Sequence, residues 1–336
     1  EIASLSGDLD WIQSLRLDGD GSGELADFKI THRQPVQFKV GAIDDTEYEE
    51  DHKGLDAYVF VDSLPAEIVV AVHKDFLRAG ARVITVNNYS ATAARLAQYG
   101  LADRFSEIHQ LATSLAQQAI AETFPEPGDQ KAVNVAGVLP PLIASYYVPA
   151  DQNYQDCYDQ YCSIIAAQAD YVEVFLVETM SSITEARAAV SALKAAGQNC
   201  YLGLTLKDDL TISLRSGEPL ARAIDVLGEN GADAICLNCS SPETIDNALT
   251  MLSDSGLRFG AYANAFKSVE PLVLGATVDS LDARTDLTPV VYTEHALGWV
   301  KHGATIIGGC CEVGPAHVAH LHDRLRKEGF KPTTLV

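Results

Sequence analysis

Short apolar runs rich in β-branched residues alternate with longer amphipathic stretches from about residue 65 onward. The short runs have the length and composition of buried strands, and the longer stretches repeat apolar residues at helical spacing. Seven runs predict strands, at 82–86, 132–138, 171–177, 200–206, 232–237, 258–262 and 304–308. The helices predicted between them include 65–79, 103–122, 182–196, 218–229, 242–253, 293–302 and 315–327.

An eighth strand is expected in the first 60 residues, either at 14–17 or at 36–40. Strands that alternate with helices are typical of a parallel sheet, and eight such units in a chain of 336 residues predict a closed α/β barrel. The fold class is therefore a (β/α)8 TIM barrel. No low-complexity linker or tandem repeat divides the chain, so we predict a single domain over 1–336, with the first strand and an acidic loop in 1–60.

The composition of the chain argues against two classes of binding partner, nucleic acids and membranes. The chain has 46 acidic and 24 basic residues, a formal net charge of −22, which argues against binding to nucleic acid. No apolar run approaches the roughly 20 residues that cross a bilayer, and the first residues lack the basic start and apolar run of a signal peptide. We expect no membrane association and a cytoplasmic location. The acidic stretch 44–51 is expected to be a solvated loop, with a cation or partner site as the alternative.

Three of the seven cysteines fall just after predicted strands. Cys239 follows the run at 232–237, and Cys310 and Cys311 follow the last run. Active sites of barrels assemble at the carboxyl ends of the strands, so we expect these thiols to converge there. Thiolates suit zinc, and three protein ligands leave a fourth position for substrate. Gly308 and Gly309 are expected to let the backbone turn sharply before the adjacent cysteines.

A cysteine is often a small buried hydrophobic residue with no chemical role. This is the expectation for Cys157, Cys162, Cys200 and Cys236, and it is an alternative for each of the other three taken singly. Seven is an odd number, and adjacent cysteines are poorly suited to an ordinary disulfide, so we expect reduced thiols.

Two segments around these cysteines, 238–243 and 308–318, closely resemble the zinc-dependent homocysteine S-methyltransferases. The resemblance covers roughly residues 60–330 and extends through five further segments: 73–81, 85–89, 177–179, 215–220 and 261–265. It implies a (β/α)8 barrel with three cysteine zinc ligands, which match Cys239, Cys310 and Cys311. It also implies a Zn²⁺ cofactor that binds the sulfur of homocysteine and lowers its pKa, so that the thiolate attacks a methyl group.

The same resemblance implies roles for other residues. Glu178 matches the glutamate that holds the amino group of homocysteine, and its alternative is a salt bridge at the barrel mouth. Asn87 and Tyr89 match positions near the bound amino acid and the metal, and Asn264 matches a residue that faces the pocket. We therefore expect Glu178 and Tyr89 to be catalytic, with Glu178, Asn87 and Asn264 binding the substrate.

The N-terminal segment diverges from the family. Residues 18–25 match only the ends of the family's glycine-rich signature, and we expect Asp18 to serve the substrate and the catalysis from this loop. The same residues fit part of a calcium-binding EF-hand loop, with Asp18, Asp20 and Ser22 at its first, third and fifth positions. Lys29 stands where that loop needs a glutamate, so the sequence favours the substrate loop.

One difference from the betaine-using relatives bears on the identity of the methyl donor. Relatives that use betaine surround its trimethylammonium group with aromatic rings, and Thr179 stands where one of these rings follows the glutamate. A sulfonium donor, S-methylmethionine or S-adenosylmethionine, is favoured over betaine or another donor. The expected partners are homocysteine and this small donor, and the sequence predicts no oligomeric state. Because so short a chain shows no folate or cobalamin module, we do not expect a full methionine synthase.

Two other classes compete with a methyltransferase. A metal-dependent barrel hydrolase would use histidine and carboxylate ligands. The sequence shows no such cluster, because His317, His320 and His322 are expected on the surface of the last helix. A non-catalytic zinc protein would need a fourth protein ligand.

Overall fold

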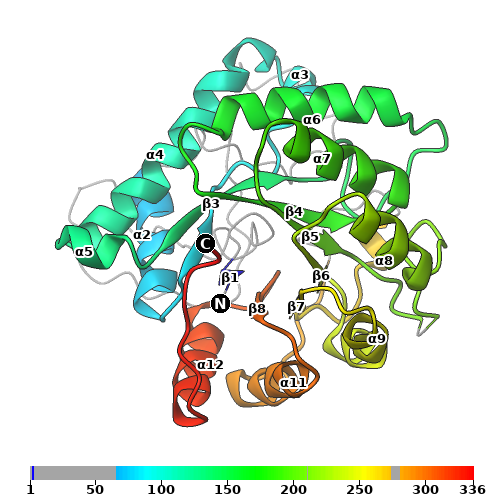
Figure 1. Ribbon diagram of the computed structural model, residues 1–336. Coiled ribbons are helices and arrows are strands. Elements are labelled where there is room, and N and C mark those ends of the chain that lie inside the picture. The colour runs from blue at the N-terminus through cyan, green and yellow to red at the C-terminus, as the bar shows by residue number, and fades with distance from the viewer. Residues whose placement is uncertain (1, 4–65, 210, 274–280) are drawn as a thin grey trace.

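Eight parallel strands close into a barrel with the helices outside it (Figure 1), in a computed structural model that describes residues 2–3, 66–209, 211–273 and 281–336. The strands are β1 (Ile2–Ala3), β2 (Val83–Thr85), β3 (Asn134–Leu139), β4 (Val174–Met180), β5 (Cys200–Leu204), β6 (Ala234–Asn238), β7 (Phe259–Tyr262) and β8 (Ile306–Gly309). Each strand pairs with the next in the chain, and β1 closes the barrel by pairing with β8. The predicted (β/α)8 fold class is confirmed.

The strands are buried along their whole length from β2 to β8. A barrel strand has one face against the interior and the other against the helices, so its sequence shows a continuous apolar run. Most polar exceptions lie at the carboxyl ends, where Thr85 ends β2, Glu178 and Thr179 precede the last residue of β4, and Asn238 ends β6. Asn134, at the start of β3, lies at the other end. The carboxyl end of the barrel therefore carries the buried polar side chains that could take part in a reaction.

Twelve helices are described around the barrel. They are α2 (Ala66–Arg78), α3 (Ala93–Gln98), the 3₁₀ helix η2 (Ala102–Arg104), α4 (Phe105–Thr123), α5 (Pro127–Gln130), α6 (Tyr154–Gln168), α7 (Ile183–Ala195), α8 (Leu220–Glu229), α9 (Pro242–Asp254), α10 (Glu270–Val273), α11 (Pro289–Lys301) and α12 (Pro315–Lys327). Helix α6 was not predicted; it begins after Asn153, whose side chain accepts from two backbone N–H groups of the first turn. Helix α11 begins four residues before its predicted start, because Thr288 caps it and Pro289 occupies its first turn.

The first strand is the part of the barrel that the sequence located least well. Ile2–Ala3 occupies its place, between β2 and β8, with Ile2 in register with Val83 and Gly308. The two segments predicted for this strand, 14–17 and 36–40, lie outside the described residues. So do Asp18, the calcium-loop alternative and the acidic stretch 44–51.

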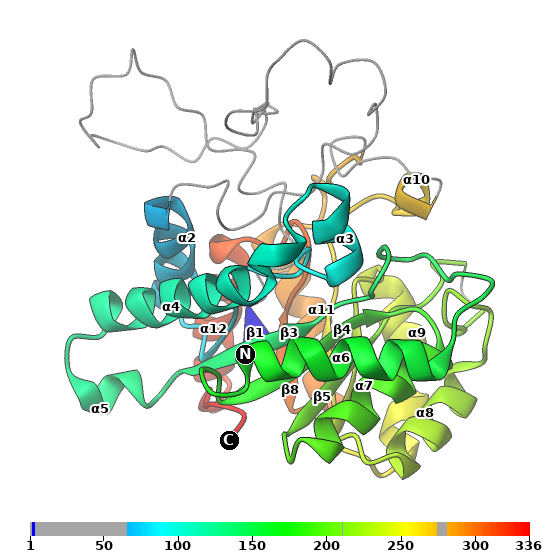
Figure 2. The same ribbon diagram turned by 90° about the horizontal axis from the view of Figure 1, so that it is seen from above.

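The last residues of the chain lie at the end of the barrel opposite the cysteines. The Leu335 N–H donates to Oδ1 of Asn134, the first residue of β3, and the Tyr201 hydroxyl donates to the Leu335 carbonyl at 3.1 Å. Figure 2 shows the C-terminus at the far end of the barrel from α3 and α10, which follow the carboxyl ends of β2 and β7. The tail covers the amino-terminal face and leaves the other mouth for a site. None of the described helices is long and apolar enough to cross a membrane.

Asp246 joins α9 to α11, and its contacts predict a pH-dependent stability. Its carboxylate accepts from the indole N–H of the buried Trp299 at 2.6 Å and faces Nδ1 of His295 at 2.8 Å. The hydrogen bond to Asp246 raises the pKa of His295. Because the folded-state pKa lies above the unfolded value of about 6.5, the pair stabilises fully below that value and loses its effect as pH rises through the folded pKa.

Asp246→Asn keeps an oxygen for Trp299 and removes the charge that faces His295. We expect it to lower the free energy of unfolding by about 1 kcal/mol at pH 5.5, discounted for partial exposure, and by less at pH 9. Urea unfolding at the two pH values measures the difference. An equal loss at both values would show that the His295 charge contributes nothing.

Candidate metal centre

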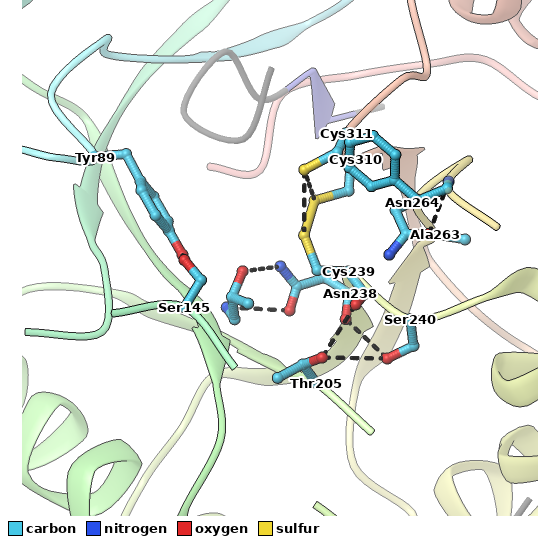
Figure 3. The surroundings of a disulfide bond; sticks show 12 residues. Tyr89, Ser145, Thr205, Asn238, Cys239, Ser240, Ala263, Asn264, Cys310 and Cys311 are labelled. Carbon is cyan, nitrogen blue, oxygen red and sulfur yellow. Dashed lines mark hydrogen bonds between the residues drawn. A yellow bond between two sulfur atoms is a disulfide. The ribbon is translucent and has the colours of Figure 1, made fainter. Parts of the chain in front are cut away.

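The structure brings the three predicted thiols together at the carboxyl mouth of the barrel (Figure 3). The sulfur atoms of Cys239, Cys310 and Cys311 all lie within 4.8 Å of one another. Sγ of Cys311 lies 3.9 Å from that of Cys239 and 3.8 Å from that of Cys310. All three side chains are buried.

Cys239 and Cys310 are joined by a disulfide. The expectation of seven reduced thiols is therefore wrong for this pair. The adjacent residues Cys310 and Cys311 remain unbonded to each other, and Cys310 instead reaches across to the end of another strand. The Cα atoms of the bonded pair are 5.7 Å apart, within the ordinary range for a disulfide.

Backbone hydrogen bonds fix all three cysteines to one segment, the end of β7 and the residues after it. Because one segment holds both loops, the relative position of the sulfurs depends on the barrel and not on the loops alone. The bonds run from the Cys239 N–H to the Tyr262 carbonyl (3.3 Å), from the Cys310 N–H to the Ala263 carbonyl (2.9 Å) and from the Ala265 N–H to the Cys311 carbonyl (2.9 Å).

Left-handed backbone surrounds the site. Four of the five described non-glycine residues with positive φ lie beside it, and such residues are sparsely populated and cluster at functional sites. These four are Tyr146 (63°), Thr179 (61°), Cys239 (46°) and Glu312 (64°). Hydrogen bonds hold two of these residues: the Thr205 hydroxyl donates to the Cys239 carbonyl at 3.1 Å, and the Thr179 N–H donates to the side-chain oxygen of Asn238.

The two glycines before Cys310 have a different role from the one expected. Neither Gly308 nor Gly309 has a positive φ. A Cβ on Gly309 would overlap the side chain of Val313, so this position needs glycine for space. The close approach of Val313 keeps the cysteine loop folded tightly over the end of β8.

The three sulfurs fit a zinc ion. Tetrahedral zinc with sulfur at about 2.3 Å places two sulfur ligands about 3.8 Å apart. Two of the sulfur pairs already have this spacing, and the third pair would reach it after reduction of the disulfide. No described histidine, aspartate or glutamate joins the group, so the chain supplies a three-sulfur set with one position left over.

Glu178 lies at the same mouth of the barrel as this group, because the end of β4 is tied to the end of β6, which Cys239 follows. The Thr179 N–H donates to Oδ1 of Asn238 at 3.1 Å, and the Asn238 amide nitrogen donates to the Thr179 hydroxyl at 3.0 Å. Asn238 directly precedes Cys239 in the chain. The Glu178 side chain is buried, with 2% of the residue exposed, so a carboxylate is held in a low-dielectric site at the mouth of the barrel.

Two buried amide nitrogens also lie at strand ends, each without a hydrogen-bond partner among the described residues. One is Nδ2 of Asn87, which follows β2, and the other is Nδ2 of Asn264, which follows β7. The oxygen of Asn264 accepts from the Phe266 N–H, so its nitrogen is the free donor. A buried amide without an acceptor is costly unless a ligand supplies one.

Tyr89 is half-buried, and its hydroxyl lies 2.8 Å from Oγ of Ser145. Figure 3 places this pair to one side of the cysteine group. Burial raises the pKa of Tyr89, and the opposing charge of Arg95 offsets only part of the effect. The phenol therefore stays protonated at neutral pH. Arg95 also donates to the Tyr89 carbonyl and is almost wholly buried, so it holds this loop in place.

Sequence reasoning missed the polar layer below the cysteines. The Ser240 hydroxyl accepts from the Leu206 N–H at 2.8 Å and donates to the Asn238 carbonyl at 3.1 Å, beside Thr205. Thr205 lies near the end of the predicted strand 200–206, and Asn238 directly follows the predicted strand 232–237. Polar residue types at these ends were the available signal.

The burial predicted for the remaining cysteines and histidines is confirmed only in part. Three of the other cysteines are buried, whereas Cys162 is half-buried. The histidines of α12, predicted on the surface, are half-buried and contact neighbouring residues. The contacts run from His317 to the Leu287 carbonyl (3.0 Å), from His320 to the Thr293 hydroxyl (2.9 Å) and from His322 to the Asp323 carboxylate (3.6 Å).

Comparison with known proteins gives a consistent result. The sequence profile of the family described as homocysteine S-methyltransferase matches residues 17–325. The chain is 24% identical over 281 residues to the methionine synthase of Mycobacterium tuberculosis and 23% identical over 280 residues to that of Mycobacterium leprae. Each alignment covers 80% of this chain and 22% of the relative, so the chain spans about a fifth of the length of these curated relatives.

Solved structures show the same barrel. The homocysteine methyltransferase MmuM from Escherichia coli, in its metallated form, superposes with a TM-score of 0.66 at 24% identity, over 79% of this chain and 86% of that one. Its oxidized form gives the same values. At this level of identity the likeness establishes the fold.

Proposed function

The chain belongs to the homocysteine S-methyltransferase family, and we propose that it transfers a methyl group to the thiol of homocysteine, giving methionine. Cys239, Cys310 and Cys311 would hold the zinc ion. The observation that carries this proposal is the meeting of three buried sulfurs at the carboxyl mouth of the barrel, with no described histidine or carboxylate among them. A barrel hydrolase would need histidine and carboxylate ligands at this place.

Zinc bound there would lower the pKa of a coordinated thiol, so that homocysteine reacts as a thiolate at neutral pH. The chain must first be reduced, because Cys239 and Cys310 cannot both be thiolate ligands while they are bonded to each other. Cys311 contributes its sulfur without this requirement.

Other residues of the chain would bind and orient the amino acid. Glu178 offers a buried carboxylate for the α-ammonium group. Asn87 and Asn264 offer buried amide donors for the α-carboxylate. Tyr89, protonated and held by Ser145, would border the reacting sulfur and help to exclude water from it. Asp18 stays a prediction for the substrate loop.

The methyl donor is proposed to be a sulfonium compound. The position after Glu178 is Thr179, whose hydroxyl and N–H are both bonded to Asn238, so it supplies no aromatic face for a quaternary ammonium. A compact sulfonium such as S-methylmethionine needs no adenosine pocket, and S-adenosylmethionine is the alternative within this class.

We expect reduced, zinc-loaded protein to form methionine from homocysteine at least about tenfold faster with a sulfonium donor than with betaine, because a missing cation–π contact costs on the order of 1–2 kcal/mol. The measurement is the initial rate with S-methylmethionine, S-adenosylmethionine and betaine offered separately. Cys310→Ala is the control for background transfer. A faster rate with betaine would refute the sulfonium assignment, and no product from any donor would refute the proposed reaction.

A further inference from the structure

The hydroxyl of Tyr262 is an unpaired polar group inside the barrel. Tyr262 is the last residue of β7, none of its surface is exposed, and its hydroxyl oxygen makes no hydrogen bond to any residue in the described part of the chain. Buried hydroxyls in proteins are nearly always hydrogen-bonded, and an exception calls for a specific partner. The neighbouring tyrosine in the barrel, Tyr201, obeys the rule by donating to the Leu335 carbonyl.

The surroundings show where this hydroxyl points. Tyr262 reaches past β6 to β5, where a Cβ on Gly203 would lie 2.6 Å from the tyrosine oxygen and 2.8 Å from Oδ1 of Asn238. The glycine thus leaves the space that the hydroxyl fills, at the level of the strand ends. Asn238 is not its partner, because both polar atoms of that amide are engaged by Thr179.

Glu178, the residue before Thr179, faces the same barrel interior as this hydroxyl, because it alternates along β4 with Val174 and Leu176, which pack in one buried cluster with Tyr262. Burial raises the pKa of Tyr262 well above its usual range, and the charge of Glu178 raises it further. The phenol is therefore neutral, with oxygen lone pairs free to accept a hydrogen bond. A buried carboxylate and a buried phenol oxygen that face the same barrel interior form a pair of acceptors, which is the complement of a cation with several N–H donors.

We propose that the Tyr262 hydroxyl accepts a hydrogen bond from the α-ammonium group of the acceptor amino acid and so makes that group a requirement for binding. The inference rests on the proposed function, in which Glu178 binds the same ammonium. A primary ammonium has three N–H donors, and one carboxylate at its side leaves a donor for a second acceptor. Tyr262 thus selects α-amino thiols over thiols that lack the amino group.

The test compares Tyr262→Phe with wild type in reduced, zinc-loaded protein, by calorimetric titration with two thiols. One is homocysteine, and the other is 4-mercaptobutyrate, which is homocysteine without its amino group. We expect the dissociation constant of homocysteine to rise about tenfold, as for one lost hydrogen bond to a charged group, and that of 4-mercaptobutyrate to change less than about twofold. The bound zinc should stay unchanged.

Tyr201→Phe is the matched control, because it removes a hydroxyl at the other end of the barrel. It should leave both dissociation constants unchanged. It should also lower the melting temperature of the ligand-free protein, because the Leu335 carbonyl loses its hydrogen-bond donor. Tyr262→Phe should leave that temperature unchanged or raise it, because it removes an unpaired polar atom.

The outcomes separate cleanly. If Tyr262→Phe weakened the binding of both thiols equally, or weakened the binding of neither, the inference would be overturned. The hydroxyl would then be assigned to a buried water. A melting temperature lowered by Tyr262→Phe without ligand would also overturn it. Wild-type protein that holds zinc but binds no homocysteine would reject the proposed function itself, a result distinct from any difference between the variants.

Discussion

Cys310→Ala is expected to weaken zinc binding at least about 100-fold and to lower methyl transfer to homocysteine at least about 1000-fold. The variant leaves two sulfurs where three now lie within 4.8 Å of one another, and two ligands do not define a tetrahedral site. Zinc content after reduction and dialysis against a competing chelator measures the first effect, and methionine formation measures the second.

Cys236→Ala is the matched control for this loss. Cys236 is also buried, lies on β6 only three residues before Cys239, and is not a member of the three-sulfur group. It should retain about one zinc per chain. If Cys310→Ala bound zinc as tightly as wild type, the metal would lie elsewhere and the assignment of all three ligands would fall.

Glu178→Gln is expected to lower kcat/KM for homocysteine by about 30- to 4000-fold, mostly through KM, with zinc content unchanged. The substitution keeps the shape and removes the charge, and loss of one partner of a buried hydrogen-bonded charge pair costs on the order of 2–5 kcal/mol. Glu178 is buried, so solvent cannot replace the contact. Steady-state rates at varied homocysteine, with the methyl donor saturating, measure the change.

Glu185→Gln distinguishes this effect from a general loss of a buried glutamate. Glu185 is equally buried, but its carboxylate accepts from the Leu142 N–H at 2.8 Å, the Tyr161 hydroxyl at 3.2 Å and the Gln152 amide at 3.0 Å. Its loss should lower stability and leave KM near that of wild type. If the two variants had the same kinetic profile, Glu178 would be a structural residue of the barrel mouth.

The strand pattern could be predicted because burial on both faces leaves a continuous apolar run, but the strand ends could not. The prediction for β4 began at Tyr171, which is exposed before the strand, and stopped at Val177 where polar residues begin. The observed strand continues through Glu178 and Thr179, because at a barrel mouth polar side chains are buried around the site. The rule that locates strands therefore ends them too early at functional residues.

The three thiols could be predicted from their place after strands, since parallel strands bring their carboxyl ends to one face. Their disulfide could not, because it joins β6 to β8 across β7, and which two of three adjacent sulfurs bond depends on distances in space. The role of Gly309 likewise depends on the approach of Val313, and the unpaired hydroxyl of Tyr262 depends on what its neighbours already bind.

The central claim is that Cys239, Cys310 and Cys311 present one zinc ion to the thiol of homocysteine. X-ray absorption at the zinc edge of the reduced, zinc-loaded protein tests it most directly, without and with homocysteine. We expect three sulfur neighbours at about 2.3 Å in the protein alone and a fourth after homocysteine is added. Fewer than three sulfurs at the start, or a sulfur number that homocysteine leaves unchanged, would contradict the account.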